Sequence, residues 1–421
     1  MLQVSAPPHP PVRDEASFRY EGWRVVAVCF VMAIFTWAFG FYGHSVFVAE
    51  LHRIHGWPTS LISSATTGFY LFGAMLVALL GEVMRRIGAR QCLLGGALTM
   101  AAAAVLLGQV SAPWQLYCVY ALLAVGWAGT SLGAITTVLG LWFDTRRGMA
   151  ISLALNGASF GGILGAPVLA LMIGWLGFPA AMLVGGATMA LVLAPLILAF
   201  VGRPPLRRRS DGAAAMGEAG ATYRADAMRT TRFWTVTVAF SLALFAQVGF
   251  LVHLVTYLDP LVGRQKAALA ISIIAIMAVV GRVLFSVVID RLNQRLAASL
   301  SFLSQGIALA VLINARDPAL LLAACGLLGF SVGNLITMPA LIVQREFDPR
   351  AFGALIGLTT AAMQVTYAFG PGFVGLVRDA AGGYAAAFYA CIAIQTVAAI
   401  VVLVRGQGSR SETSPSGSGN S

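Results

Sequence analysis

The chain consists mainly of long apolar runs separated by short polar segments. From Val25 to Val404 these runs recur at about 20 residues or more, without the alternation of polar and apolar positions that a barrel strand requires. A helix of that length crosses a hydrocarbon core of about 30 Å and satisfies its own backbone hydrogen bonds there. The pattern predicts an all-α membrane protein with twelve transmembrane helices, at 24–50, 58–83, 91–110, 114–141, 148–174, 178–201, 233–257, 267–289, 296–315, 319–343, 352–377 and 383–404.

The longest polar stretch divides these predicted helices into two sets of six. It contains Pro204, Pro205 and a run of three arginines, and its centre is rich in Gly and Ala, which is typical of a linker. Matching Arg clusters and Gly/Pro positions in the two sets indicate two parallel six-helix repeats with a solute site between them. We therefore predict a cytoplasmic N-terminal tail, an N-terminal half, a cytoplasmic linker, a C-terminal half and a disordered cytoplasmic tail, at 1–23, 24–201, 202–232, 233–404 and 405–421.

Composition and charge agree with lipid as the surrounding medium. The chain is 59% hydrophobic and 10% charged, with a mean hydropathy of +0.84. The net charge of +11 does not indicate nucleic acid, because the arginines lie in short clusters between apolar runs. With the N-terminus inside, 21 of the 27 Lys and Arg residues fall on the cytoplasmic side. We therefore expect a multi-pass protein of a bacterial-type inner membrane with both termini in the cytoplasm.

Arg282 is the most informative polar residue, because it falls within the predicted span 267–289. A guanidinium stays charged, and burying it in a span costs at least about 2.5–3.5 kcal/mol, so it should face the bundle interior or water. No Asp or Glu lies deep in a predicted span, so an anionic solute is one candidate for its counter-charge. The alternative is an arginine that reaches towards the cytoplasm or bonds to backbone carbonyls.

Further polar residues within the predicted spans are candidates for binding a solute. His44 and His253 lie near the outer ends of their spans and are of a type that titrates near neutral pH, although an interfacial histidine is the alternative. The remaining candidates bind a solute or, alternatively, bond across helices: Tyr42, Tyr70, Trp127, Asn156, Gln247, Asn334, Gln364 and Tyr367. In the cytoplasmic loops, Arg86, Asp290 and Arg291 are candidate gating residues, with plain topological anchoring as the alternative.

Two motifs resemble known transporter families. Gly81-Glu82-Val83-Met84-Arg85-Arg86-Ile87-Gly88-Ala89-Arg90 is similar to the signature that follows span two in the major facilitator superfamily, with Arg85 in place of the acid, which the second half keeps as Asp290. The segment from Trp142 to Gly157, with Trp-Phe-Asp-Thr-Arg-Arg at its start, is similar to the motif entering span five of monocarboxylate and oxalate/formate porters. Glu21-Gly22-Trp23-Arg24 opens span one as it often does in those porters.

The resemblance implies the major facilitator fold and an anion-binding role for Arg282. It also implies that the first and fourth helices of each half line the cavity, which favours Trp127, and His44 lies roughly where monocarboxylate porters carry a lysine. Some relatives carry an acid one turn before the arginine, where this chain has Ala278, so carboxylate-based proton coupling at that position is not expected.

We therefore expect a secondary transporter of a small, monocarboxylate-like organic anion that works by alternating access. Its energy would come from protons or from exchange against another anion. A carrier of a larger amphipathic metabolite or drug is the second hypothesis. An intramembrane enzyme is the third, but it needs a cluster of acids, histidines or nucleophiles that the spans lack. We expect no catalytic residue, cofactor or metal site, and a monomer in the lipid bilayer.

Overall fold

The computed structural model describes residues 15, 17, 19–202, 228–288, 292–348 and 351–404, without the side chains of 286–288, 353 and 354. The described part is helical, and ten of its helical segments are long and apolar enough to cross a membrane. The first group of helices, here called the N-bundle, comprises α1 (Gly22–Trp37), the π-helix η1 (Ala38–Tyr42), α2 (Gly43–His55), α3 (Thr59–Ile87), α4 (Ala89–Leu107), α5 (Pro113–Thr130), α6 (Leu132–Trp142), α7 (Arg147–Leu176) and α8 (Phe178–Phe200).

The second group, here called the C-bundle, follows the predicted linker. It comprises α10 (Thr231–Val262), α11 (Arg264–Val288), α12 (Gln294–Asn314), α13 (Pro318–Val332), α14 (Met338–Glu346), α15 (Phe352–Ala368), α16 (Gly370–Ala381) and α17 (Tyr384–Leu403).

Four predicted spans are interrupted. The first contains the five-residue π-helix η1, and the span 114–141 breaks at Ser131, whose backbone is extended. The span 319–343 becomes α13 and α14 with the turn 333–337 between them, and 352–377 becomes α15 and α16 on either side of Phe369. Hydropathy does not reveal these breaks, because the residues at them are small or apolar and a window of side-chain polarity does not sense backbone conformation.

Glycines at four-residue spacing bring α1 and α7 into close contact. A Cβ atom added at Gly157 would lie 2.1 Å from the carbonyl oxygen of Phe30, and one at Gly161 would lie 2.5 Å from that of Ile34. In the C-bundle a Cβ at Gly281 would likewise lie 2.1 Å from a backbone oxygen of α13. Van der Waals packing through small residues therefore holds these helix pairs together, as the spacing of small residues predicts.

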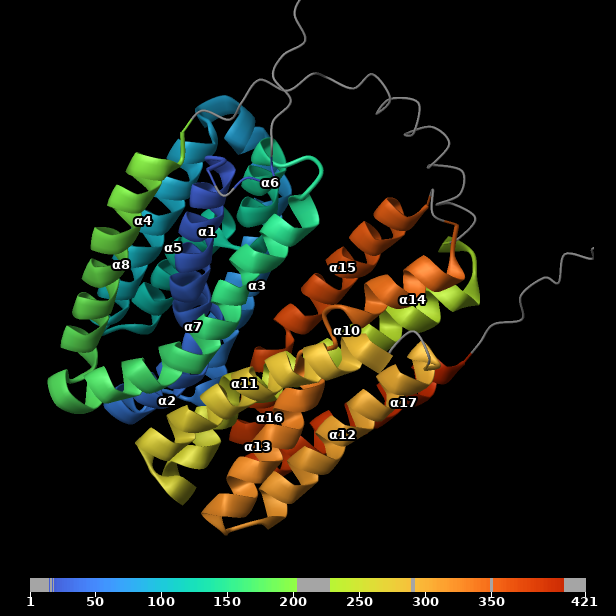
Figure 1. The fold of residues 1–421 in the computed structure, drawn as a ribbon. Coiled ribbons are helices and arrows are strands. Elements are labelled where there is room, and N and C mark those ends of the chain that lie inside the picture. The colour runs from blue at the N-terminus through green and yellow to red at the C-terminus, as the bar shows by residue number, and fades with distance from the viewer. Residues whose placement is uncertain are drawn as a thin grey trace, which may run out of the picture.

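The two bundles have matching neighbour relations. In the N-bundle α1 contacts α7, α4 contacts α5 and α8, and α3 contacts α5; in the C-bundle α10 contacts α15, α12 contacts α13 and α17, and α11 contacts α13. Figure 1 shows the bundles diverging towards the end where α8 finishes and α10 begins, here called the linker end. They meet towards the opposite end, the far end, where α2 contacts α10, α7 contacts α11, and α3 contacts α15 and α16.

At the linker end, the segment before α1 is anchored to the turn that precedes α7. The Glu15 carboxylate accepts hydrogen bonds from the backbone N–H groups of Asp144 and Arg146 and from the hydroxyl of Thr145. Burial by itself would raise the pKa of Glu15, but these hydrogen bonds lower it below its ordinary value. The ring of Trp23 also packs against Phe143. The two motifs that carry the porter resemblance therefore contact each other.

Candidate functional site

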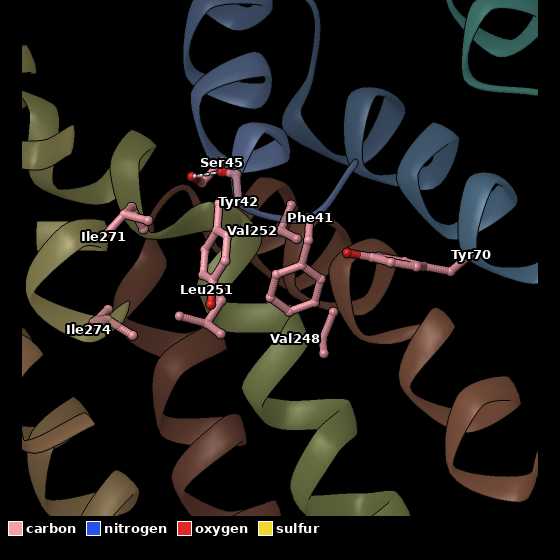
Figure 2. A pocket seen from close by; sticks show the side chains of 9 residues that line it. All are labelled: Phe41, Tyr42, Ser45, Tyr70, Val248, Leu251, Val252, Ile271 and Ile274. Atoms are coloured by element: carbon pink, nitrogen blue, oxygen red, sulfur yellow. Dashed lines mark hydrogen bonds between the residues drawn. The ribbon is translucent and has the colours of Figure 1, made fainter. Parts of the chain in front are cut away.

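The bundles close on each other around a small apolar space. Figure 2 shows the rings of Phe41 and Tyr42 and the hydroxyl end of Tyr70 directed towards α10 and α11. The space has a volume of about 10 Å³, about enough for one water molecule, so this region is closed to a solute. Its walls are Phe41, Tyr42, Ser45 and Tyr70 from the N-bundle and Val248, Leu251, Val252, Ile271 and Ile274 from the C-bundle.

Arg282 joins the two bundles next to this closure. Its side chain is half-buried, and its Nη2 atom donates a hydrogen bond of 2.8 Å to the Ser159 hydroxyl on α7. Its positive charge also acts on the hydroxyl of Tyr42. Within the part of the chain that the structure describes, Arg282 forms no ion pair with a carboxylate. The Arg282 guanidinium is therefore a fixed positive charge between the bundles, and it has further N–H groups that can donate hydrogen bonds.

Three of the predicted tyrosines lie at this meeting of the bundles. The ring of Tyr42 packs so closely against α7 that a Cβ at Gly162 would lie 2.6 Å from it. Tyr70 on α3 and Tyr367 on α15 face each other, with ring centroids 5.4 Å apart. The structure thus brings Tyr42, Tyr70, Tyr367 and Arg282 to one region, from helices that are far apart in sequence.

His44 is fully buried beside this region, and no described side chain bonds to its ring nitrogens; the group that interacts with its ring is the backbone of Gly40, one turn earlier. Tyr70 and Tyr120 pack against it with centroids 5.7 and 5.5 Å away; the buried Tyr70 hydroxyl has no partner among the described residues, and the Tyr120 hydroxyl interacts with the side chain of Thr66. Phe47 and Phe69 complete the surrounding cage. A buried polar atom without a partner costs free energy, so the Tyr70 hydroxyl is suited to hold a water molecule, whereas a charged imidazole is disfavoured inside this aromatic cage.

Three other predicted residues are engaged in bonds within the C-bundle. Gln247 accepts from Gln305, which in turn accepts from Gln395, in a chain that links α10, α12 and α17. Both ring nitrogens of His253 have partners, the Tyr384 hydroxyl at 3.1 Å and the Pro371 carbonyl at 3.0 Å.

Asn334 is also buried, and its amide donates to the Phe330 carbonyl. Bonding across helices is the alternative that the sequence left open for Gln247 and Asn334, and an interfacial histidine was the alternative for His253. Gln247 does bond across helices, Asn334 bonds within its own helix, and His253 is buried and bonds to residues of α16 and α17.

The remaining predicted residues that the structure describes do not line the closed space. Trp127 packs against Trp37 with centroids 5.2 Å apart, Asn156 is exposed on α7, and Gln364 is half-buried on α15. The exposed Arg86 pairs with Glu82 on its own helix. Asp290 and Arg291 lie outside the described residues.

At the far end a buried ion pair connects the bundles. Glu50 at the end of α2 is 2% exposed and contacts Arg264 at the start of α11, with Oε1 and Nε 3.0 Å apart. On its own helix Glu50 also pairs with Arg53 at 2.7 Å. A buried carboxylate needs such partners, because water no longer solvates it. This contact therefore holds the far end closed.

Asp379 makes a second connection between the bundles at the far end. Its carboxylate accepts hydrogen bonds from the Thr59 hydroxyl and the Ser60 N–H group at the start of α3, and it pairs with the neighbouring Arg378. Partial burial alone would raise the pKa of Asp379, but the bonds from Ser60, Arg378 and Thr59 lower it well below its ordinary value. A lowered carboxyl pKa means that this contact is complete at neutral pH and is lost only as pH falls through that lowered value. Mild acid therefore leaves it intact.

The sequence did not identify Ser159, Glu50, Arg264 or Asp379 as functional residues. Ser159 is a small residue in a glycine-rich helix, and the other three lie at the ends of predicted spans, where charged residues are ordinary. For Glu50 the sequence did contain a signal, because this acid occupies the last position of the predicted span 24–50. Its partner Arg264 is more than two hundred residues away, so local spacing could not connect them.

Among the described residues, no group of three or more His, Cys, Asp or Glu side chains could hold a metal ion.

The helices, the closure between two bundles and the charged group beside it are those of a polytopic membrane transporter. The sequence profile of the Major Facilitator Superfamily matches residues 27–292 and 262–420. The chain belongs to this family, which confirms the family resemblance, and its class is that of transporters rather than enzymes.

The chain is also similar to individual family members. It is 29% identical over 295 residues to the MFS-type transporter pynF of Aspergillus niger, covering 69% of this chain and 65% of that one, just under two thirds of its length. It is 25% identical over 408 residues to Monocarboxylate transporter 12-B of Danio rerio, covering 87% and 83%.

Among solved structures, a bacterial homolog of the human lysosomal transporter Spinster, crystallised in an inward-facing and unoccupied conformation, matches with a TM-score of 0.73. The match has 14% identity and covers 92% of this chain and 97% of that one. At this identity the likeness concerns the fold alone.

Proposed function

We propose that this protein is a secondary transporter that carries a small organic anion, of the monocarboxylate kind, by alternating access. The observation that carries the proposal is the guanidinium of Arg282, which bridges the bundles through Ser159 and has no carboxylate partner in the described part of the chain. A carboxylate of the solute would supply the missing counter-charge in a bidentate pair. The similarity to monocarboxylate transporters supports this choice of solute.

The same proposal includes the organisation of the chain. Twelve spans form two six-helix repeats, 24–201 and 233–404, joined by a linker at 202–232 and flanked by tails at 1–23 and 405–421. The matching neighbour relations of the two bundles support the repeat. In an inner membrane with both termini cytoplasmic, the linker end faces the cytoplasm and the closed far end faces outward. The described arrangement is then inward-facing, as is the Spinster homolog.

Energy for transport comes from a proton gradient or from exchange against a second anion. His44 is the candidate for a proton site, because it is the titratable ring beside Tyr70 at the meeting of the bundles, and its charged form requires the surrounding cage to open to water during transport. The pair Glu50–Arg264 and the contacts of Asp379 act as the outer gate. We propose that the monomer is the working unit.

A carrier of a larger amphipathic metabolite or drug is the second candidate. It is favoured by an apolar groove of about 850 Å³ that runs between α1, α7 and α11. In such a carrier apolar contacts would dominate, and neutral or cationic solutes would still be transported after loss of the Arg282 charge.

The test is uptake of labelled carboxylates of different size into proteoliposomes, with and without a pH gradient. We expect Arg282→Gln to reduce the uptake of monocarboxylates at least about tenfold, because a charged hydrogen bond contributes about 1.5–3 kcal/mol. Ser159→Ala should reduce it less, since Ser159 carries no charge and the guanidinium remains.

Arg316→Gln is the matched control, because Arg316 is exposed at the far end and bonds to the carbonyls of Ile313 and Ala315. It removes the same charge from the protein and should leave uptake unchanged. Equal rates for the native protein and Arg282→Gln across the whole panel would refute the role of Arg282.

A further inference from the structure

A groove of about 850 Å³ lies between the two bundles, with walls from α1 and α7 on one side and α11 on the other. Its volume is in the range of pockets that hold drug-sized ligands, about 300–1,000 Å³. Most of its wall is apolar, including Phe30, Phe160, Ile276, Val279, Val280 and Val283. Phe160 and Ile276 are 46% and 45% exposed, so their apolar surface is not covered by protein.

The groove also has a polar part, which includes the serine that bonds to Arg282. Asn156 and Ser159 line the groove one helical turn apart on the same face of α7. The Ser159 hydroxyl accepts the 2.8 Å hydrogen bond from Arg282, which is itself not part of the groove wall. A positive charge without a carboxylate partner is therefore separated from a long apolar surface only by the side chain of Ser159.

Arg282 and the groove wall lie on adjoining faces of the same helix. Ile276, Val279, Val280 and Val283 follow the spacing of one helical face, and Arg282 lies beside that face. A ligand whose anionic group is held by Arg282 can thus place its apolar part along the groove without crossing the closed contact around Tyr42.

We propose that the groove binds the apolar part of an amphipathic monocarboxylate, whose carboxylate is held by Arg282, Ser159 and the amide of Asn156. This inference rests on the proposed function and narrows it, from small organic acids in general to acids with a long hydrocarbon chain or a ring. Each methylene that moves from water into the groove adds about fourfold in affinity. A three-carbon acid would leave most of the groove unused.

The experiment measures how straight-chain monocarboxylates of three to ten carbons inhibit uptake of a labelled three-carbon acid into proteoliposomes. Protein-free liposomes correct for leakage that long acids cause. With the native protein, the eight-carbon acid should inhibit at a concentration at least tenfold lower than the three-carbon acid. The eight-carbon primary alcohol should not inhibit, because it has no carboxylate.

Ile276→Trp fills part of the groove two turns from Arg282. It should reduce the preference for the eight-carbon acid at least tenfold, measured against inhibition by the three-carbon acid in the same variant. Leu284→Trp is the matched control, because Leu284 is 53% exposed on the same helix but does not line the groove. This control should behave like the native protein.

A flat dependence on chain length, or equal effects of Ile276→Trp and Leu284→Trp, would overturn the inference and leave the groove to membrane lipid. Arg282→Gln separates this result from failure of the proposed function. If it abolishes inhibition by all acids while chain length has no effect, only the groove proposal fails. If it changes nothing while the preference for long chains persists, the proposed anion site fails and the apolar groove remains.

Discussion

A comparison of Arg282 with Arg295, another arginine of the C-bundle, shows why Arg282 is informative. Arg295 is 2% exposed, forms a bidentate pair with Glu346 and donates to the Thr235 hydroxyl and to backbone carbonyls of Arg232, Val402 and Val404. Its charge and its donors are satisfied, so its role is structural. Arg282 donates one hydrogen bond in the described part of the chain, to a neutral hydroxyl. This unmatched charge between two bundles is the basis of the proposed anion site.

His44 provides the prediction at the residue scale. His44→Phe should preserve the aromatic cage and remove the buried ring nitrogens, so we expect the thermal stability in detergent to change by no more than about 1–3 kcal/mol. If His44 carries the coupled proton, the same variant should lose stimulation of uptake by an inward proton gradient while anion exchange continues.

The control is His253, whose nitrogens both have partners. His253→Phe should lower stability, because it leaves the Pro371 carbonyl and the Tyr384 hydroxyl without their bonds. Full gradient dependence in a stable His44→Phe protein would exclude His44 as the proton site and favour exchange.

At the scale of elements, the packing of α1 on α7 is set by glycines. Gly157→Ala would place a Cβ atom 2.1 Å from the carbonyl oxygen of Phe30, so the helices must separate. We expect a loss of about 1–3 kcal/mol, as in other overpacked cores, measured as a lower melting temperature in detergent.

Gly174 on the same helix provides the comparison, because a Cβ atom there would meet nothing within 4 Å. Gly174→Ala should be neutral or slightly stabilising, since alanine favours the helix by up to about 1 kcal/mol. Equal melting temperatures for the two variants would contradict the packing argument.

At the scale of the whole molecule, the far-end contacts determine which side is closed. Arg264→Gln should weaken the closure, because Glu50 then loses its ion pair with the other bundle. We expect the population open at the far end to rise at least about fivefold, which corresponds to a coupling of about 1 kcal/mol. Spin labels at the exposed positions Ile54 and Leu320, with exposed Cys118 replaced by Ser, would report longer distances.

Arg53→Gln distinguishes a gate from simple loss of charge. Arg53 pairs with the same Glu50 but lies on the same helix, so its bond does not connect the bundles. Its removal should leave the distance distribution close to native. A shift of the same size in both variants would mean that the buried charge of Glu50, and not the contact with Arg264, controls the opening.

Much of the fold follows from the one-dimensional pattern. Each of the twelve predicted spans overlaps a helix or an interrupted pair of helices, and the family resemblance is confirmed. The breaks at Ser131 and Phe369 were missed because they depend on backbone conformation. Tyr42, Tyr70 and Arg282 were named as candidates and lie together, because polar residues in apolar spans are costly enough to stand out. Gln247 was an equally clear candidate, but its amide oxygen accepts a hydrogen bond from a neighbouring helix.

The sequence by itself determined that the chain lives in lipid, since no water-soluble fold could cover so much apolar surface, and that one guanidinium lies at membrane depth. Tertiary structure decided which polar residues are satisfied within a bundle and which remain available. It also paired Glu50 with Arg264 and Asp379 with Ser60. Hydropathy is a local property of each segment, whereas these pairings join residues hundreds of positions apart, and only the packing of the two bundles brings them into contact.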